Sequence, residues 1–273
     1  MISLLQGSTP LLIFVCVVGA VFGAVMGSFL NCAAGRLAKD EPFIKGRSHC
    51  PACGHALGVP DLVPVFSWIF LGGKCRHCGA KISPRYLITE LLFAALTVAC
   101  LLFFDSPVLC LRNWVMICCL FCLSLVDFES QIIPNGTLLI AVGAWVAAEP
   151  FLFENWTKTI AHVCTGALLF FGLLGISLVM DRILKRDSLG GGDIKLFGVV
   201  GLYLGLLPGL FALILSCILG LTVNLPRQRG NSEPFPFGPW IAIATAVMLF
   251  FGTSLVSWYL GLMHLEKLPA FLI

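Results

Sequence analysis

The sequence predicts an all-α polytopic membrane protein with about eight transmembrane helices and a small polar insert between the first and second helices. Of the 273 residues, 59% are hydrophobic and only 11% are charged, whereas an ordinary soluble domain is about 45–50% apolar and about 25% charged. The mean hydropathy is +0.99. The apolar residues form unbroken runs, and a transmembrane β-barrel would instead show alternation. These observations exclude a soluble globular enzyme, a disordered chain and a nucleic-acid-binding protein.

Apolar runs of the length needed to cross a bilayer, about 20 residues, account for most of the chain. They cover residues 9–34, 86–104, 111–126, 136–149, 159–183, 194–206, 207–225 and 238–263. The fourth and sixth runs are short, and only Leu207-Pro208-Gly209 separates the sixth from the seventh, so seven spans is the alternative count. The first run lacks the basic flank of a secretory signal, which predicts a retained helix. We therefore divide the chain into a first helix (1–34), an insert (35–85) and a helical core (86–273).

Lysine and arginine are distributed unequally between the two sides of this predicted bundle. With eight spans, only Arg112, Lys158 and Lys267 of the 17 Lys and Arg residues fall on one side. The others flank the spans on the side that carries the insert. Because cytoplasmic loops hold the excess of Lys and Arg, the insert is predicted to be cytosolic, and both termini are predicted to lie on the opposite side.

The insert contains two Cys-x-x-Cys pairs, Cys50-Pro51-Ala52-Cys53 and Cys75-Arg76-His77-Cys78, separated by 21 residues. Two such turns can complete a tetrahedral four-thiolate zinc site, and four protein ligands leave no open position, so the metal is predicted to be structural. The glycines that follow each pair, Gly54 and Gly79, suit tight knuckle turns. The nine other cysteines lie in apolar stretches and are predicted to be packing residues.

Other interpretations of these cysteines are weaker. Two disulfides would form such pairs, but a cytosolic compartment keeps thiols reduced. A thioredoxin-like redox pair would need a βαβ pattern, which the sequence does not have. The histidines His49, His55 and His77 are nearby alternative ligands.

Two aspartates stand at ends of predicted spans, where ionisable residues are costly and therefore candidates for function. Asp127 closes the third span, and Asp193 opens the sixth after Gly190, Gly191 and Gly192. Both fall at the predicted cytosolic ends and could face one another. The glycines would let a peptide substrate approach the backbone closely. Lys195 could tune Asp193 or act as a snorkelling anchor.

Paired carboxylates permit water-activated amide hydrolysis, because two carboxylates held close together share a proton. The ionised group then takes a proton from water, and the protonated group polarises the scissile carbonyl. Alternatively, Asp127 could simply end a helix, and Asp193 could be an N-cap after a glycine loop. Glu129 is a rival carboxylate, whereas Asp181 and Asp187 are predicted to be loop charges.

Five motifs in order resemble those of the type IV prepilin peptidase family, bacterial inner-membrane aspartyl proteases with a GxGD motif. They are Gly27-Ser28-Phe29-Leu30-Asn31 with Arg36, the two cysteine pairs, Asp127 with Ile132-Ile133-Pro134-Asn135, Gly190-Gly191-Gly192-Asp193-Ile194-Lys195, and Phe235-Pro236-Phe237-Gly238-Pro239. The resemblance covers nearly the whole chain. It is far more specific than a single GxGD would be.

The resemblance implies an endopeptidase that removes the short basic leader from type IV prepilins and type II secretion pseudopilins, on the cytosolic face and after a glycine. It also implies that the new amino-terminal residue is then methylated with S-adenosylmethionine, as in many members that have the cysteine-bearing insert. Asp127 and Asp193 match the catalytic pair, and Cys50, Cys53, Cys75 and Cys78 match the zinc ligands. The sequence has no Rossmann-type glycine fingerprint, and Glu90 is a weak candidate for cofactor binding.

Two alternatives to a peptidase remain at this point. A transporter could use intramembrane carboxylates to carry ions, but it would need polar residues deep within several spans, and these spans are nearly all apolar. A structural component of a pilus or secretion machine could use the zinc insert as a docking module. It would not need Asp127 and Asp193 at a common depth.

Overall fold

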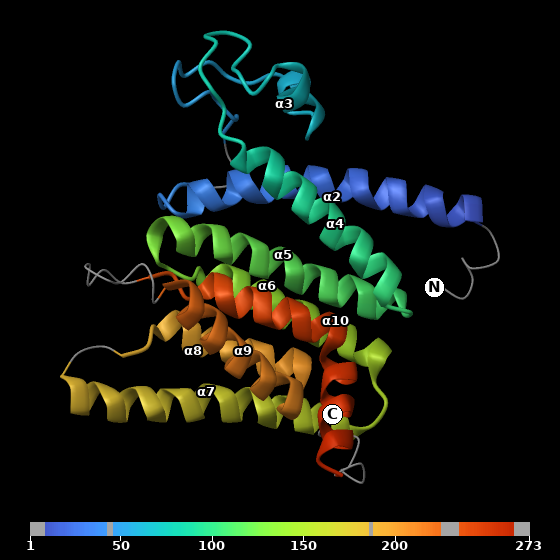
Figure 1. Cartoon of the computed structure of the whole chain (residues 1–273), viewed down its shortest axis with the longest axis vertical. Helices are drawn as coiled ribbons and strands as arrows, with labels where there is room; N and C mark the ends of the chain where they lie inside the picture. Colours follow the sequence, from blue (N-terminus) through green and yellow to red (C-terminus); the bar gives the residue numbers. More distant parts are fainter. Residues whose placement is uncertain (1–8, 43–45, 186–187, 225–234, 265–273) are drawn as a thin grey trace. The chain divides into compact units, whose positions relative to one another are not determined.

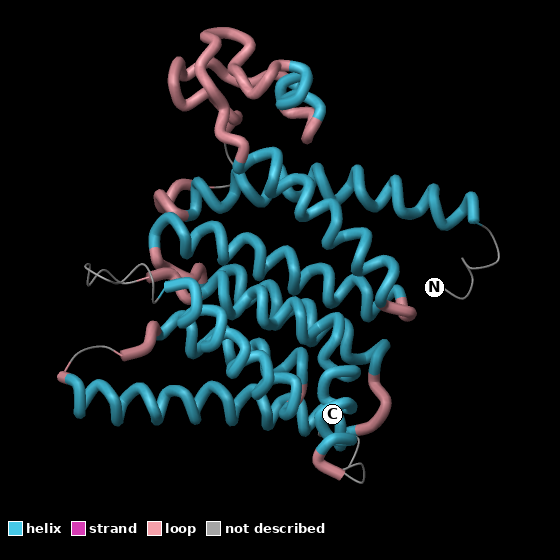
Figure 2. The backbone as a smooth tube through the Cα atoms, in the orientation of Figure 1, coloured by secondary structure: helices cyan, strands magenta, loops and turns pink. Residues whose placement is uncertain are grey.

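The described part of the computed structural model, residues 9–42, 46–185, 188–224 and 235–264, is built from helices joined by loops, without strands (Figure 2). Lys267 and Asp187 lie outside these residues. The helices are α2 (Thr9–Leu37), η1 (Val59–Asp61), α3 (Phe66–Phe70), α4 (Arg85–Phe103), α5 (Pro107–Ser130), α6 (Asn135–Leu152), α7 (Trp156–Leu184), α8 (Gly191–Leu204), α9 (Leu206–Asn224) and α10 (Gly238–Leu262).

Seven of these helices are long and apolar enough to cross a membrane, namely α2, α4, α5, α6, α7, α9 and α10. The predicted fold class is therefore confirmed. The predicted sixth span forms a separate helix, α8, whose 14 residues extend only about 21 Å at 1.5 Å per residue, less than the hydrocarbon core of about 30 Å. Gly205, with φ of +75°, separates α8 from α9.

The chain forms two compact units, residues 1–114 and 115–273, and the boundary lies within α5. In the first unit, α2 packs against α4 (Figure 1). Gly23 and Gly27 let the two backbones approach closely, since a Cβ on Gly23 would lie 2.8 Å from the Ala94 Cα. Small residues at four-residue spacing are the usual means of such close packing in membranes. The division into first helix, insert and core stays a prediction.

In the second unit, the short helix α8 occupies the core. Eight of its residues are buried, and it contacts α6, α7, α9 and α10. A helix that is hydrophobic all round is stable only when it is surrounded. Gly201 meets Gly166 of α7 so closely that an added Cβ would lie 2.8 Å from the Gly166 Cα, and the Tyr203 hydroxyl donates to the Ala141 carbonyl at 2.7 Å. Tertiary packing therefore compensates for the short length of α8.

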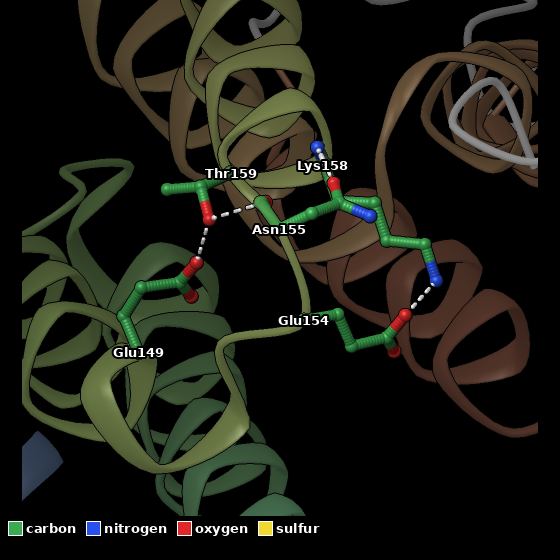
Figure 3. A network of polar contacts seen from close by, with 5 residues as sticks. All are labelled: Glu149, Glu154, Asn155, Lys158 and Thr159. Carbon is green, nitrogen blue, oxygen red and sulfur yellow. Dashed lines mark hydrogen bonds and ion pairs between the residues drawn. The ribbon is translucent and has the colours of Figure 1, made fainter.

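The connection between α6 and α7 is fixed by polar contacts, shown in Figure 3. Asn155 is the N-cap of α7, and its Oδ1 accepts the Lys158 backbone N–H at 2.8 Å. Lys158 also pairs with Glu154, and the Thr159 hydroxyl donates to Glu149 of α6. These contacts close the α6–α7 hairpin at the end of α6 opposite to Asn135.

Candidate active site and metal centre

Asp127 lies in the last turn of α5 and is only 5% exposed. Its Oδ2 accepts the backbone N–H of Gly238, the first residue of α10, at 2.9 Å. The N–H groups at a helix start have no partner within the helix, and the positive end of the helix dipole favours a negative charge there. The amino terminus of α10 therefore both orients the Asp127 carboxylate and favours its charged form.

Asp193 lies in the first turn of α8 and is partly buried. Gly190 is the N-cap of α8, and a Cβ on Gly190 would lie 2.8 Å from Asp193 Oδ2. The carboxylate thus occupies space that any other residue at position 190 would need. Gly190 and Gly191 are exposed, so the backbone before Asp193 is open to solvent.

Two contacts join the start of α8 to the segment between α5 and α6. A Cβ on Gly192 would lie 2.9 Å from the Ile133 Cβ, and Lys195 Nζ donates to Asn135 Oδ1 at 3.0 Å. The end of α5 and the starts of α8 and α10 consequently lie at one end of this unit, on the left in Figure 1. The Asp127 and Asp193 carboxylates are close enough to repel each other electrostatically.

The rival carboxylates have other surroundings. Glu129 lies two residues beyond Asp127 on α5 and is exposed. Asp181 accepts the Ser188 backbone N–H at 2.7 Å. Lys195 contacts Asn135 and is exposed. Gly238 belongs to the fifth motif, and Pro239 beside it marks the start of a helix, but the sequence did not indicate that the Gly238 N–H binds Asp127.

The four insert cysteines come together in the first unit. Their Sγ atoms all lie within 4.8 Å of one another, and the Sγ atoms of Cys50 and Cys78 are 3.9 Å apart. In a tetrahedral site with Zn–S bonds of about 2.3 Å, neighbouring sulfurs are about 3.8 Å apart. The cluster therefore fits one four-coordinate metal ion. The His55 and His77 rings lie against each other beside it, tilted by 56° with centroids 4.2 Å apart.

Each half of the cluster has the same backbone design. Cys50 N–H donates to the His55 carbonyl and Gly54 N–H donates to the Cys50 carbonyl, both at 2.9 Å. The Cys75 half repeats both bonds, at 2.8 and 2.9 Å. Gly54 and Gly79 both have φ of +70°, a conformation that glycine adopts without steric cost. The Cys53 and Ala52 backbone N–H groups lower the pKa of Cys50 to about 7, which favours the thiolate that binds metal.

Glu90 lies near the start of α4 and is 7% exposed. Its Oε2 accepts the backbone N–H of Val65, in the insert, at 2.7 Å. Glu90 thus attaches the insert to the membrane-spanning helix that follows it.

The sequence matches two family profiles in order. Residues 21–104 match the bacterial peptidase A24 N-terminal domain, and residues 114–225 match the type IV leader peptidase family. A prepilin leader peptidase/N-methyltransferase from Dichelobacter nodosus is 32% identical, over 76% of this chain and 72% of the relative. The chain belongs to the type IV leader peptidase family.

Two further relatives align with this member of the type IV leader peptidase family over nearly their whole length. A prepilin leader peptidase/N-methyltransferase from Bacillus subtilis is 29% identical, over 88% of this chain and 96% of the relative. A type 4 prepilin-like proteins leader peptide-processing enzyme from Escherichia coli is 31% identical, over 86% and 93%. No solved structure matches the chain.

Proposed function

We propose that this protein is an aspartyl endopeptidase that removes the basic leader peptide from type IV prepilins or type II secretion pseudopilins. The observation that carries the proposal is that Asp127, at the end of α5, and Asp193, at the start of α8, lie at the same end of the second unit. The names of the relatives support the substrate class.

In this mechanism Asp127 is the general base. The Gly238 N–H and the start of α10 stabilise its negative charge. The repulsion between the two carboxylates then leaves the shared proton on Asp193. Asp127 takes a proton from a water molecule, and the resulting hydroxide attacks the scissile carbonyl carbon while Asp193 donates its proton to the carbonyl oxygen.

The tetrahedral intermediate then collapses. The proton on Asp127 passes to the leaving amine nitrogen as the carbon–nitrogen bond breaks, and Asp193 recovers a proton from the new carboxylic acid. One water molecule is consumed, and the pair returns to its singly protonated state. The exposed glycines Gly190 and Gly191 give the substrate backbone room to approach the carboxylates.

The site lies on the cytosolic face of a bacterial inner membrane in this proposal. The excess of lysine and arginine on the insert side supports that orientation. A basic leader would stay in the cytosol while the apolar pilin helix enters the bilayer. The scissile bond would then lie at the boundary, level with the end of α5 and the start of α8.

The metal of the insert is zinc in this proposal, held by Cys50, Cys53, Cys75 and Cys78. A closed four-thiolate zinc ion supplies cross-linking and no reaction chemistry. The matching backbone bonds of the two knuckles support a structural role.

The relatives' names also support N-methylation of the new amino terminus, with S-adenosylmethionine as the methyl donor. In the part of the chain that the structure describes, the hollow of the insert does not fit that cofactor. The insert has a hollow of about 450 Å³, but Lys74 and Lys81 line it and would repel a sulfonium cation. Glu90, the acidic candidate, is buried and bonded to Val65. We derive no methyl-transfer step from these residues.

The test is leader cleavage of a synthetic prepilin by Asp127→Asn and Asp193→Asn, each reconstituted in vesicles. Both variants should lose cleavage while keeping their helical circular dichroism. An asparagine amide can neither take the proton from water as Asp127 does nor donate one to the carbonyl oxygen as Asp193 does. Glu129→Gln is the matched control, an exposed carboxylate two residues from Asp127, and should cleave normally. Retained cleavage by both aspartate variants would reject the peptidase and favour a transporter or a structural component.

A further inference from the structure

The short helix α3 turns its large apolar side chains outward. Phe66, Ile69 and Phe70 are 57%, 55% and 83% exposed, and their spacing places them on one helix face. The rings of Phe66 and Phe70 stack with centroids 6.4 Å apart. Trp68 lies on the other face, where its Nε1 donates to the Ile82 carbonyl and its ring lies against Gly73. Helix α3 thus has an outward apolar face that the rest of the insert does not bury.

The position of α3 along the membrane-spanning helix α4 is fixed by Glu90. This residue is the sixth of α4, about 7 Å along the helix axis from its start at Arg85. Its carboxylate holds the Val65 N–H at 2.7 Å, and Val65 is the N-cap of α3. The first turn of α3 is therefore level with the second turn of α4, a helix long and apolar enough to cross a membrane that begins at Arg85.

The backbone at Val65 adds to the case that this attachment is specific. Val65 has φ of +64° and ψ of −56°, and the Phe66 N–H donates to the Pro64 carbonyl at 2.6 Å. This is the strained form of the γ-turn, which is rare, and a β-branched residue at positive φ is an outlier. Such strain persists only where the surroundings impose it, here the Glu90 carboxylate.

Positive charge flanks the same part of the insert. Lys74 and Lys81 are paired across an antiparallel bridge and are both exposed. Like charges directly opposite one another are destabilising unless an anion lies between them. The hollow of about 450 Å³ is lined by both lysines, Trp68 and Ser83. Lys81 precedes the start of α4 by only four residues, so this hollow lies close to the first turn of the candidate membrane span.

We infer that the outward face of α3, formed by Phe66, Ile69 and Phe70, lies in the interface of the bilayer leaflet on the insert side, with acidic lipid headgroups bound at Lys74 and Lys81. Continuity with α4 and charge complementarity point to lipid as the occupant. Aromatic and aliphatic side chains on one face with lysines beside them are typical of helices that lie in the membrane plane. Lysines beside an anionic leaflet are attracted to its headgroups.

The test places the photo-crosslinker p-benzoylphenylalanine at Phe70 in the full-length, zinc-loaded protein, in vesicles of phosphatidylethanolamine and phosphatidylglycerol. Mass spectrometry should detect lipid adducts at position 70. The same probe at Ala56, an exposed insert residue outside α3, should give severalfold fewer. Zinc content shows that each protein is folded, and leader cleavage plays no part in the readout.

A charge variant tests the headgroup contact separately. Lys81→Gln should lower the lipid adduct yield at Phe70 about fivefold, the equivalent of about 1 kcal/mol. Lys39→Gln, which removes an exposed lysine just after α2, should leave the yield unchanged. Equal adduct yields at Phe70 and Ala56 would overturn the inference. So would an adduct at Phe70 that forms with added prepilin and not with lipid, which would make α3 a substrate-docking surface.

Discussion

The two sites of this protein are assembled in opposite ways. The four cysteines lie within residues 50–78, and each pair is arranged by its own turn. The aspartate site joins the end of α5 to the starts of α8 and α10, and the hydrogen bond from the Gly238 N–H to the Asp127 carboxylate spans 111 residues. The first site is local in sequence, and the second exists only when the helices of the second unit are packed.

This difference has an energetic consequence. A cluster of local turns buries little apolar surface, so it depends on its ion for stability, as small metal domains do. The aspartate site depends on close helix packing, where a single methyl group can displace a carboxylate oxygen. The insert should therefore be sensitive to metal, and the aspartate site should be sensitive to side-chain volume.

The largest expected effect is that of metal removal on the insert. Structural zinc contributes about 10–16 kcal/mol to small domains at neutral pH, more than turns of this kind can replace. Chelation should deprotect the backbone amides of residues 46–84 in hydrogen exchange and leave the helical circular dichroism nearly unchanged. The Cys50→Ser, Cys75→Ser double variant is the control, since chelation should change it no further. A loss of helical signal across the chain would show that the two sites are not independent.

The next effect concerns volume at the aspartate site. A Cβ on Gly238 would lie 2.9 Å from Asp127 Oδ2, so Gly238→Ala must displace the carboxylate or break its bond to the backbone. A displacement of about 1 Å can cost about 100-fold in rate. We expect kcat for leader cleavage to fall by about that factor with KM little changed.

Gly136→Ala is the matched control for Gly238→Ala. Gly136 lies in the first turn of α6, and a Cβ there would meet nothing within 4 Å. This variant should cleave at the normal rate. Normal cleavage by Gly238→Ala would show that α10 does not position Asp127.

The sequence revealed the local site more completely than the distant one. Cys50, Cys53, Cys75 and Cys78 carry their chemistry in their spacing, and the structure brings their sulfurs into one cluster. The sequence indicated Asp127 and Asp193 as candidate functional residues because a charged group at the end of a membrane span is costly. Their catalytic roles stay a prediction, and cleavage by the asparagine variants decides it.

The features that the sequence did not reveal depend on backbone groups and on packing. Gly238 acts through an N–H that every residue except proline has, so composition cannot indicate it. Glu90 was a candidate for cofactor binding, but its partner is the backbone of Val65, which no spacing rule predicts. The short length of α8 is tolerated because four helices surround it. The hydropathy of a segment does not indicate which helices will pack around it.

A smaller effect separates turn geometry from metal chemistry within the insert. Gly79 has φ of +70°, and a residue with a Cβ costs about 1–2 kcal/mol in that conformation. Gly79→Ala should weaken zinc binding by about 5- to 30-fold in a chelator competition. Gly35→Ala, in α2 with nothing within 4 Å of the added Cβ, should not. Equal zinc affinities in the two variants would mean that the knuckle relaxes without cost.

The smallest expected effect is that of the ion pair between Asp61 and Arg76, whose atoms Oδ1 and Nε are 2.7 Å apart. The Arg76 guanidinium and the Gly58 N–H lower the pKa of Asp61 below its ordinary value. A carboxylate with a lowered pKa in the folded state stabilises the fold above its unfolded pKa, near 4, and loses that contribution only as the pH falls through the folded value.

Asp61 therefore stays charged at pH 6 and above. The Arg76 side chain is 59% exposed, and pairs of this kind contribute less than about 1 kcal/mol. Asp61→Asn should weaken zinc binding by less than about fivefold, and by the same factor at pH 6 as at pH 8. If the loss of zinc affinity grew between pH 6 and pH 8, Asp61 would titrate within that range. The ion pair would then contribute to the stability of the insert together with the metal.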